Sequence, residues 1–105
     1  MERDRFSLEL ENIVGQLIEK YNPLKIILFG SLVRDEEPRD IDLFIVKENP
    51  PHIGRERIYE LDRLIKYKIA TDFIVYTPKE VAERLKLKDP FIKGILEEGK
   101  VLYEK

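Results

Sequence analysis

The sequence has no cysteine and only one histidine, His52, among its 105 residues. The absence of cysteine excludes a disulfide framework, a thiolate metal cage and a cysteine nucleophile. A lone histidine also argues against a zinc site, because such sites draw nitrogen and sulfur ligands from several residues.

The sequence also lacks a basic excess and a long apolar run. There are 19 Lys and Arg against 21 Asp and Glu, so the net charge is −2. A general binder of phosphate backbones would be basic, so we do not expect nucleic acid as a partner, although a small local anion site is compatible with this balance. No apolar run approaches the roughly 20 residues that span a bilayer, and no signal-peptide stretch follows the N-terminus. We therefore expect a soluble, cytoplasmic protein with no membrane partner.

The length predicts one compact domain over residues 1–105, since most domains have about 100–150 residues. Apolar residues from Leu10 to Tyr21 recur at helical spacing and predict an amphipathic helix. Ser7 is a plausible N-cap for this helix, and Asn22-Pro23 ends it, because proline moves the preceding residue out of the α region.

Short apolar segments predict the strands, and helical spacing with capping signals predicts the remaining helices. The expected strands are Leu24 to Gly30, Asp40 to Val46, Ile69 to Tyr76 and an edge strand at Val101 to Tyr103. The expected helices are a short one after Gly30-Ser31, one over Gly54 to Lys68, one that begins at Thr77-Pro78, and one from Asp89-Pro90 to a C′ glycine, Gly99. This order predicts an α/β (α+β) fold in which helices flank a small mixed sheet.

The second strand begins with a pair of acidic residues, Asp40 and Asp42. Residues i and i+2 of a strand point to one face, so the two carboxylates would lie about 6–7 Å apart and repel each other unless a cation lay between them. Hard oxygen ligands suit Mg²⁺, which normally also binds phosphate oxygens of a substrate. The alternative is that aspartate is simply frequent where strands begin.

The third strand contains a further acid, Asp72, in an otherwise apolar segment. Aspartate is depleted in strands, and burying a lone carboxylate costs several kcal/mol. If the second and third strands are neighbours, Asp72 completes a cluster of three acids, the arrangement that holds two metal ions for in-line phosphoryl or nucleotidyl displacement. The alternative is that Asp72 pairs with a Lys or Arg of a helix.

A Gly-Ser turn, Gly30-Ser31, closes the first strand, and Arg34 follows about one helical turn later. Glycine lets a ligand approach the backbone, and the amides at a helix start can bind an anion. The Ser31 hydroxyl adds a further hydrogen bond, and the guanidinium of Arg34 fits the geometry of a phosphate. The turn and the acids together predict a phosphate site beside a metal site.

This order of Gly30-Ser31, Arg34, Asp40-x-Asp42 and a later Asp72 resembles the minimal nucleotidyltransferases, single-domain members of the DNA polymerase beta superfamily. The likeness extends over nearly the whole chain, to the tail Ile92 to Glu104. Two features depart from the usual pattern. The stretch between Ser31 and Asp40 is shorter than in many members, and Arg39 stands where a small residue commonly precedes the acidic pair.

The resemblance implies a polymerase-beta-like nucleotidyltransferase fold and a role for each motif residue. Gly30 and Ser31 would hold the triphosphate, with Arg34 in a supporting role. Asp40, Asp42 and Asp72 would be catalytic and would bind two Mg²⁺ ions. The substrate would be a nucleoside triphosphate, and we expect ATP.

The family likeness also implies a partner. Members are often paired, as antitoxin, with a small all-helical HEPN toxin, and they silence it by adding AMP to a tyrosine. The expected activity is thus that of a protein adenylyltransferase. The alternatives are a non-catalytic module that binds nucleotide or neutralises a helical partner by occlusion, and a structural domain with solvated acids. Self-association of the chain also stays open.

Overall fold

The computed structural model describes residues 2–34, 37 and 40–105 of the chain. The elements follow in the order α1 (Glu2–Gln16), η1 (Leu17–Tyr21), β1 (Lys25–Phe29), η2 (Gly30–Leu32), β2 (Ile41–Val46), α2 (Gly54–Leu64), β3 (Thr71–Tyr76), α3 (Pro78–Lys86), α4 (Pro90–Glu98) and β4 (Lys100–Glu104). Here η1 is a π-helical turn and η2 a 3₁₀ turn. The order agrees with the expectation from the sequence. None of the helices in this described part is long and apolar enough to cross a membrane.

The four strands form one mixed sheet in the order β3-β2-β1-β4. Strand β1 pairs antiparallel with β2 and with β4, whereas β2 and β3 are parallel. The parallel pair needs a crossover connection, which α2 provides. The predicted edge strand at the C-terminal end is β4, and the expected mixed sheet is confirmed.

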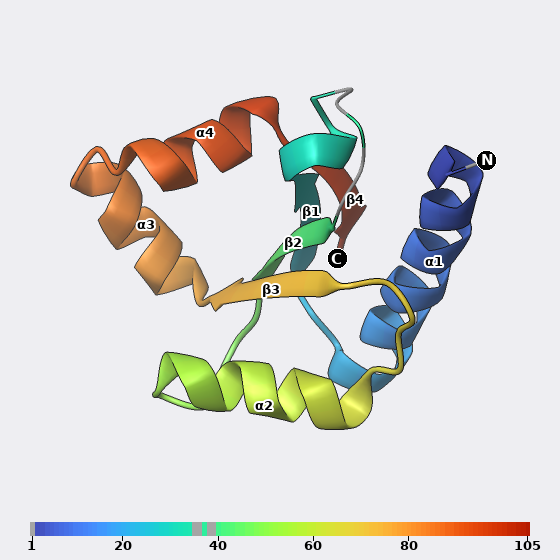
Figure 1. Cartoon of the computed structure of the whole chain (residues 1–105). Helices are drawn as coiled ribbons and strands as arrows, with labels where there is room; N and C mark the ends of the chain where they lie inside the picture. The colour runs from blue at the N-terminus through green and yellow to red at the C-terminus, as the bar shows by residue number, and fades with distance from the viewer. Residues whose placement is uncertain (1, 35–36, 38–39) are drawn as a thin grey trace.

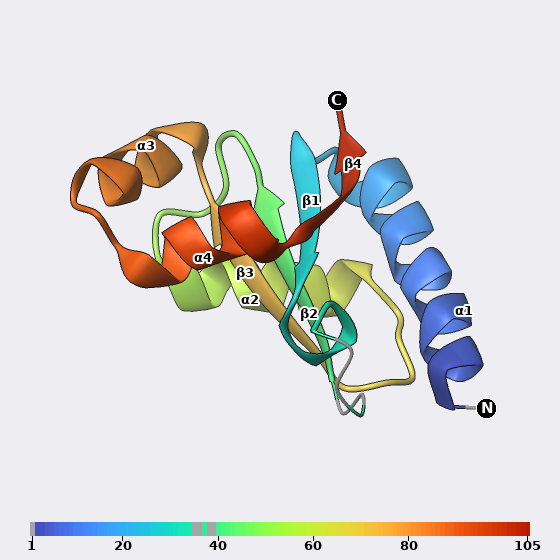
Figure 2. The same ribbon diagram turned by 90° about the horizontal axis from the view of Figure 1, so that it is seen from above.

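Helices cover both faces of the sheet (Figure 1), as the continuous apolar sequence of β2 predicts. On one face, Leu43 and its neighbours pack with residues of α1 and α2. On the other face, Phe44 packs with Ile92 and Ile95 of α4. Figure 2 shows the second layer from above, with α4 crossing the sheet. Strand residues therefore alternate between the α1/α2 face and the α4 face.

The first helix begins earlier than its sequence signals indicate. It starts at Glu2, so Ser7 lies inside the helix and the predicted N-cap is wrong. The reason is tertiary packing, since Phe6 is only 2% exposed and anchors the first turns on the core. The predicted end is correct: Asn22 adopts a left-handed conformation with φ 54° immediately before Pro23.

The second predicted helix ends at Leu64 rather than Lys68. The side chain of Gln16 accepts a hydrogen bond from the amide of Lys66 at 2.8 Å and donates one to its carbonyl at 2.7 Å. These bonds pair the backbone N–H and C=O of Lys66, which helical hydrogen bonds would otherwise pair. Strand β3 begins only at Thr71.

The caps of α3 and α4 are as predicted. Thr77 and Glu80 form a reciprocal capping box, and the Asp89 side chain accepts a hydrogen bond from the amide of Phe91 at 2.9 Å. The role of Gly99 differs from the prediction, because its φ is −70° and it forms no left-handed cap. A Cβ there would lie 2.4 Å from the carbonyl oxygen of Ile95, so close packing explains the glycine.

Candidate active site

The parallel pairing of β2 and β3 places Asp42 directly opposite Asp72. Paired residues of adjacent strands share a face, and the strands lie about 4.8 Å apart. The two carboxyl groups share a hydrogen bond on the α4 face, the face of Phe44 and Ile74. The expectation that Asp72 lies beside the acidic pair is therefore confirmed for Asp42.

The third acid, Asp40, lies just before β2 and adds its negative charge to the same place. Burial first, and then the nearby carboxylates of Asp72 and Asp40, together raise the pKa of Asp42 to about 6, while the positive charge of Arg34 opposes them. Asp42 thus lies near two further acidic residues and one basic residue, Arg34, and the sequence indicated all of them as site residues. This crowding of negative charge is what a bound cation relieves.

The Gly-Ser turn lies directly against these acids. Gly30 follows Phe29, which pairs with Asp42 across the β1–β2 ladder. The φ of Gly30 is +82°, and a Cβ built on it would lie only 2.1 Å from Oδ2 of Asp42. Glycine is therefore required here both for the backbone conformation and for the space that the carboxylate occupies.

The short helix expected after Gly30-Ser31 is a single 3₁₀ turn, η2. The amides of Val33 and Arg34 both donate to the carbonyl of Gly30, at 3.1 and 3.2 Å. An anion at this turn would be bound by the amides that open it, the Ser31 hydroxyl and the Arg34 guanidinium, with little contribution from a helix dipole. Arg39, the other basic residue noted beside the acids, lies outside the described residues.

The acids do not form a preassembled metal cage. Within residues 2–34, 37 and 40–105, no three His, Asp or Glu side chains are grouped closely enough to hold a metal ion. The donor chemistry nevertheless fits Mg²⁺, because the cluster offers hard carboxylate oxygens and an unbalanced negative charge around Asp42. Binding of Mg²⁺ stays a prediction, to be carried by Asp40, Asp42 and Asp72.

Two buried charged residues, Glu9 and Arg57, were not anticipated from the sequence; they are 8% and 6% exposed. Each precedes a fully buried helix residue by four positions, Ile13 and Leu61 respectively, so helical spacing could have revealed both. Arg57 binds the carboxylate of Glu80 at 2.7 Å, and the carboxylate of Glu9 accepts the amides of Lys68 and Ile69. Their contacts are with the framework around β3.

Comparison with known proteins defines the class to which this arrangement belongs. The family model described as "Polymerase beta, Nucleotidyltransferase" matches residues 11–105. The chain therefore belongs to the polymerase beta nucleotidyltransferase family, and the likeness drawn from Gly30-Ser31 and the three acids is confirmed at that level.

A solved structure supports the same fold. A protein from Sulfolobus solfataricus, described as a "putative nucleotidyltransferase", superposes with a TM-score of 0.66 at 21% sequence identity, and the match covers 96% of this chain and 82% of that one. At this identity the likeness concerns the fold, which is polymerase-beta-like. No curated protein gives a significant match.

Proposed function

We propose that this nucleotidyltransferase-family protein uses Mg²⁺ to transfer AMP from ATP to a hydroxyl group of a protein. The observation that carries the proposal is the convergence of Gly30, Asp42 and Asp72 on one edge of the sheet. A turn suited to phosphate and a cluster suited to divalent cations lie in contact there.

The nucleotide would lie with its phosphates along η2. The Ser31 hydroxyl and the amides that open the turn donate hydrogen bonds to phosphate oxygens, and the Arg34 guanidinium neutralises part of their charge. The absence of a side chain at Gly30 lets the phosphates come close to the Asp42 carboxylate.

Asp40, Asp42 and Asp72 would hold Mg²⁺ beside the phosphate turn. When bound, the cation neutralises charge on the phosphates and lowers the pKa of the acceptor hydroxyl. The acceptor oxygen forms a bond to the α-phosphorus, the bond from that phosphorus to the bridging oxygen of the β-phosphate breaks, and pyrophosphate leaves. The hydroxyl proton passes to a carboxylate or to solvent, so no histidine base is needed.

The acceptor would approach from the side of β3. This strand is an edge of the sheet, and Asp72 is exposed on it, whereas Asp42 is partly buried. A hydroxyl on another protein can therefore reach Asp72 from outside. The family resemblance supports a tyrosine of a small helical HEPN toxin as that acceptor, which would give the protein an antitoxin role.

The test is transfer of label from [α-³²P]ATP in the presence of Mg²⁺. The purified chain is incubated with a HEPN-type helical protein and, in parallel, with a version of that protein in which every tyrosine is replaced by phenylalanine. We expect label on the first protein only. Asp42→Asn and Asp72→Asn should each lower transfer at least 100-fold, whereas Asp4→Asn, an exposed acid on α1, should leave it unchanged.

Other outcomes would redirect the proposal. Label on the tyrosine-free protein would keep the transferase and reject the tyrosine acceptor. Binding of ATP with no transfer to any acceptor would favour the non-catalytic module. Absence of any effect of ATP and Mg²⁺ on thermal unfolding would favour a structural domain.

A further inference from the structure

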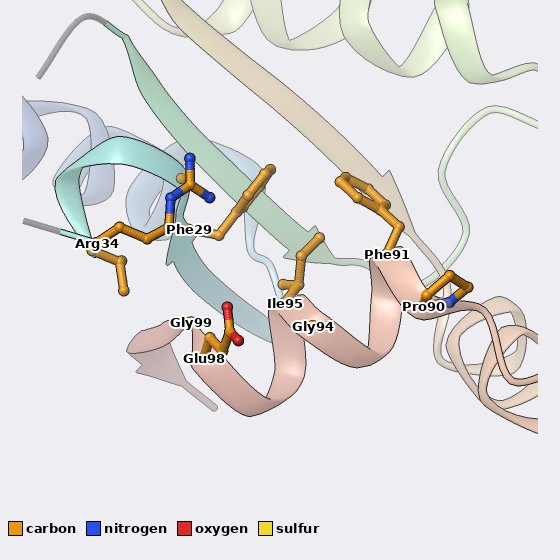
Figure 3. A pocket seen from close by; sticks show the side chains of 10 residues that line it. Phe29, Arg34, Pro90, Phe91, Gly94, Ile95, Glu98 and Gly99 are labelled. Carbon is orange, nitrogen blue, oxygen red and sulfur yellow. The ribbon is translucent and has the colours of Figure 1, made fainter. Parts of the chain in front are cut away.

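A cavity of about 200 Å³ opens between α4 and the end of β1 (Figure 3). Phe29, Gly30 and Arg34 line one wall, and Phe91 and Gly94 of α4 line the opposite wall. We refer to this cavity as the α4 pocket. It shares Gly30 with the phosphate turn, so the two are continuous.

The α4 pocket lies on a defined side of the acidic cluster. Phe29 pairs with Asp42 across the β1–β2 ladder and therefore shares its face of the sheet. Asp72 lies on the other side of Asp42, because the strand order is β3-β2-β1. The pocket thus lies beyond the phosphate turn, away from the edge where an acceptor hydroxyl would enter.

We propose that the α4 pocket binds the base of the nucleoside triphosphate, an inference that rests on the proposed function. The volume is below the roughly 300–1,000 Å³ of a pocket for a complete small ligand, so it suits one ring system while the phosphates lie outside it. The other aromatic ligand to consider for the α4 pocket is the acceptor tyrosine. The acceptor is proposed to enter on the β3 side, next to Asp72, and this argues against a tyrosine in the α4 pocket.

The aromatic lining provides a surface for stacking. Phe91 meets Phe29 edge to face, with ring centroids 6.0 Å apart and an interplanar angle of 88°. Phe91 remains 50% exposed, so part of its ring is open to a ligand. Stacking of a base on an aromatic side chain is tolerant of the base's identity, because every base presents a π-face.

Gly94 keeps the pocket open. It lies within α4, and a Cβ built on it would meet nothing within 4 Å. Glycine inside a helix costs stability relative to residues with a side chain, so helix formation does not explain its presence. A larger side chain at position 94 would project into the pocket without striking the backbone.

The experiment compares ATP with inorganic tripolyphosphate, which carries the phosphates but no base. Binding of each to the whole chain is measured by calorimetry in Mg²⁺. In Gly94→Leu we expect ATP affinity to fall at least tenfold, about 1.4 kcal/mol, while tripolyphosphate affinity stays unchanged. Gly15→Leu is the matched control, because Gly15 is also a helix glycine with open space and does not line the pocket.

A second variant tests the same proposal by removing an aromatic ring from the α4 pocket instead of filling it. Phe91→Ala should weaken ATP but not tripolyphosphate, whereas Leu87→Ala, which removes an exposed apolar side chain outside the pocket, should weaken neither. Circular dichroism melts establish that each variant is folded. Normal ATP affinity in folded Gly94→Leu would overturn the base site and leave the proposed function standing. Failure of the unmodified chain to bind either ligand would overturn both.

Discussion

Gly30 and Asp42 pack so closely that the Asp42 carboxylate fills the space a side chain at position 30 would need. The contact joins the end of β1 to the second residue of β2, and the ladder between these strands fixes it. The phosphate turn and the acidic cluster are therefore one structural unit, and a change on one side of the contact moves the other.

Gly30→Ala should damage both stability and activity. The added methyl group would have to displace Oδ2 of Asp42, and the φ of +82° is strained for any residue with a Cβ, at a cost of about 1–2 kcal/mol. We expect a lower melting temperature and a loss of nucleotide binding, measured by circular dichroism and calorimetry.

The matched control is Gly15→Ala, which adds the same methyl group where nothing lies within 4 Å. Since Gly15 is inside α1, this change should stabilise the protein by about 0.5–1 kcal/mol. Equal melting temperatures for Gly30→Ala and the unmodified chain would contradict the close packing of Gly30 on Asp42.

The raised pKa of Asp42 predicts how stability depends on pH. Its pKa is about 6 in the folded protein and near 3.9 in an unfolded chain. The folded state thus binds the proton more tightly than the unfolded state. The contribution of Asp42 to the free energy of unfolding is therefore complete below about pH 4 and is lost as the pH rises through about 6. One pKa unit corresponds to about 1.4 kcal/mol, but solvent screening of this partly exposed group reduces the whole effect to about 1 kcal/mol.

Asp42→Asn isolates that contribution, because it removes the titrating group and keeps the shape. Urea unfolding of both proteins between pH 4 and 7.5, without divalent cations, gives the difference in their free energies of unfolding. As the pH rises, the unmodified protein should lose stability relative to Asp42→Asn, because only the unmodified protein has a titrating group at position 42. A difference that does not change with pH would show that neither burial nor the neighbouring carboxylates raise the pKa of Asp42.

The elements of the fold that local sequence signals specify were predictable. Continuous apolar residues marked β2 as buried on both faces, and the Thr77-x-x-Glu80 box and Asp89-Pro90 marked two helix starts. The sequence also indicated that Asp72 would lie beside the acidic pair if the second and third strands were neighbours, and the pairing of β2 with β3 meets that condition for Asp42.

Features that depend on contacts distant in sequence were not predictable in the same way. The end of α2 depends on Gln16, 50 residues away from Lys66, and the start of α1 depends on burial of Phe6. The α4 pocket depends on the angle at which α4 crosses β1, which no local pattern specifies. Gly99 was recognised as significant, but its reason is the proximity of the Ile95 carbonyl rather than its own backbone angle.

Arg57 should contribute strongly to stability, although its contacts do not include Asp40, Asp42 or Asp72. Its guanidinium donates to the carbonyls of Pro51 at 2.6 Å and Val75 at 2.9 Å, as well as to Glu80. Arg57→Ala removes the donor to both carbonyls and the ion pair with Glu80, and we expect a loss of about 2–4 kcal/mol in the free energy of unfolding. Arg57→Lys should recover only part of it, because an ammonium group cannot reproduce the planar fork.

The control for Arg57 is an exposed ion pair. Lys93 and Glu97 lie 3.9 Å apart on the surface of α4, so Lys93→Ala should cost less than about 0.5 kcal/mol. Urea unfolding followed by circular dichroism provides both values. Similar costs for the two variants would contradict a structural role for the buried arginine.

Glu9 links α1 to the segment that leads into β3. Its carboxylate accepts hydrogen bonds from the amides of Lys68 and Ile69 and from the side chain of Asn12 at 3.0 Å. Burial alone would raise the pKa of Glu9, but the hydrogen bonds from these three residues outweigh it and hold the pKa below its usual range. The stability from this group is therefore present above about pH 4.3 and is lost as the pH falls through the lowered value.

Glu9→Gln keeps the size of the side chain and removes its charge, so we expect a loss of about 1–3 kcal/mol at neutral pH. Hydrogen exchange should accelerate at the amides of Lys68 and Ile69, while Glu11→Gln, at an exposed position of the same helix, should change neither quantity. Because Asp72 follows this segment, nucleotide transfer should also fall in Glu9→Gln. Unchanged exchange at the two amides would show that the segment before β3 is held by the sheet alone and that α1 has no part in positioning Asp72.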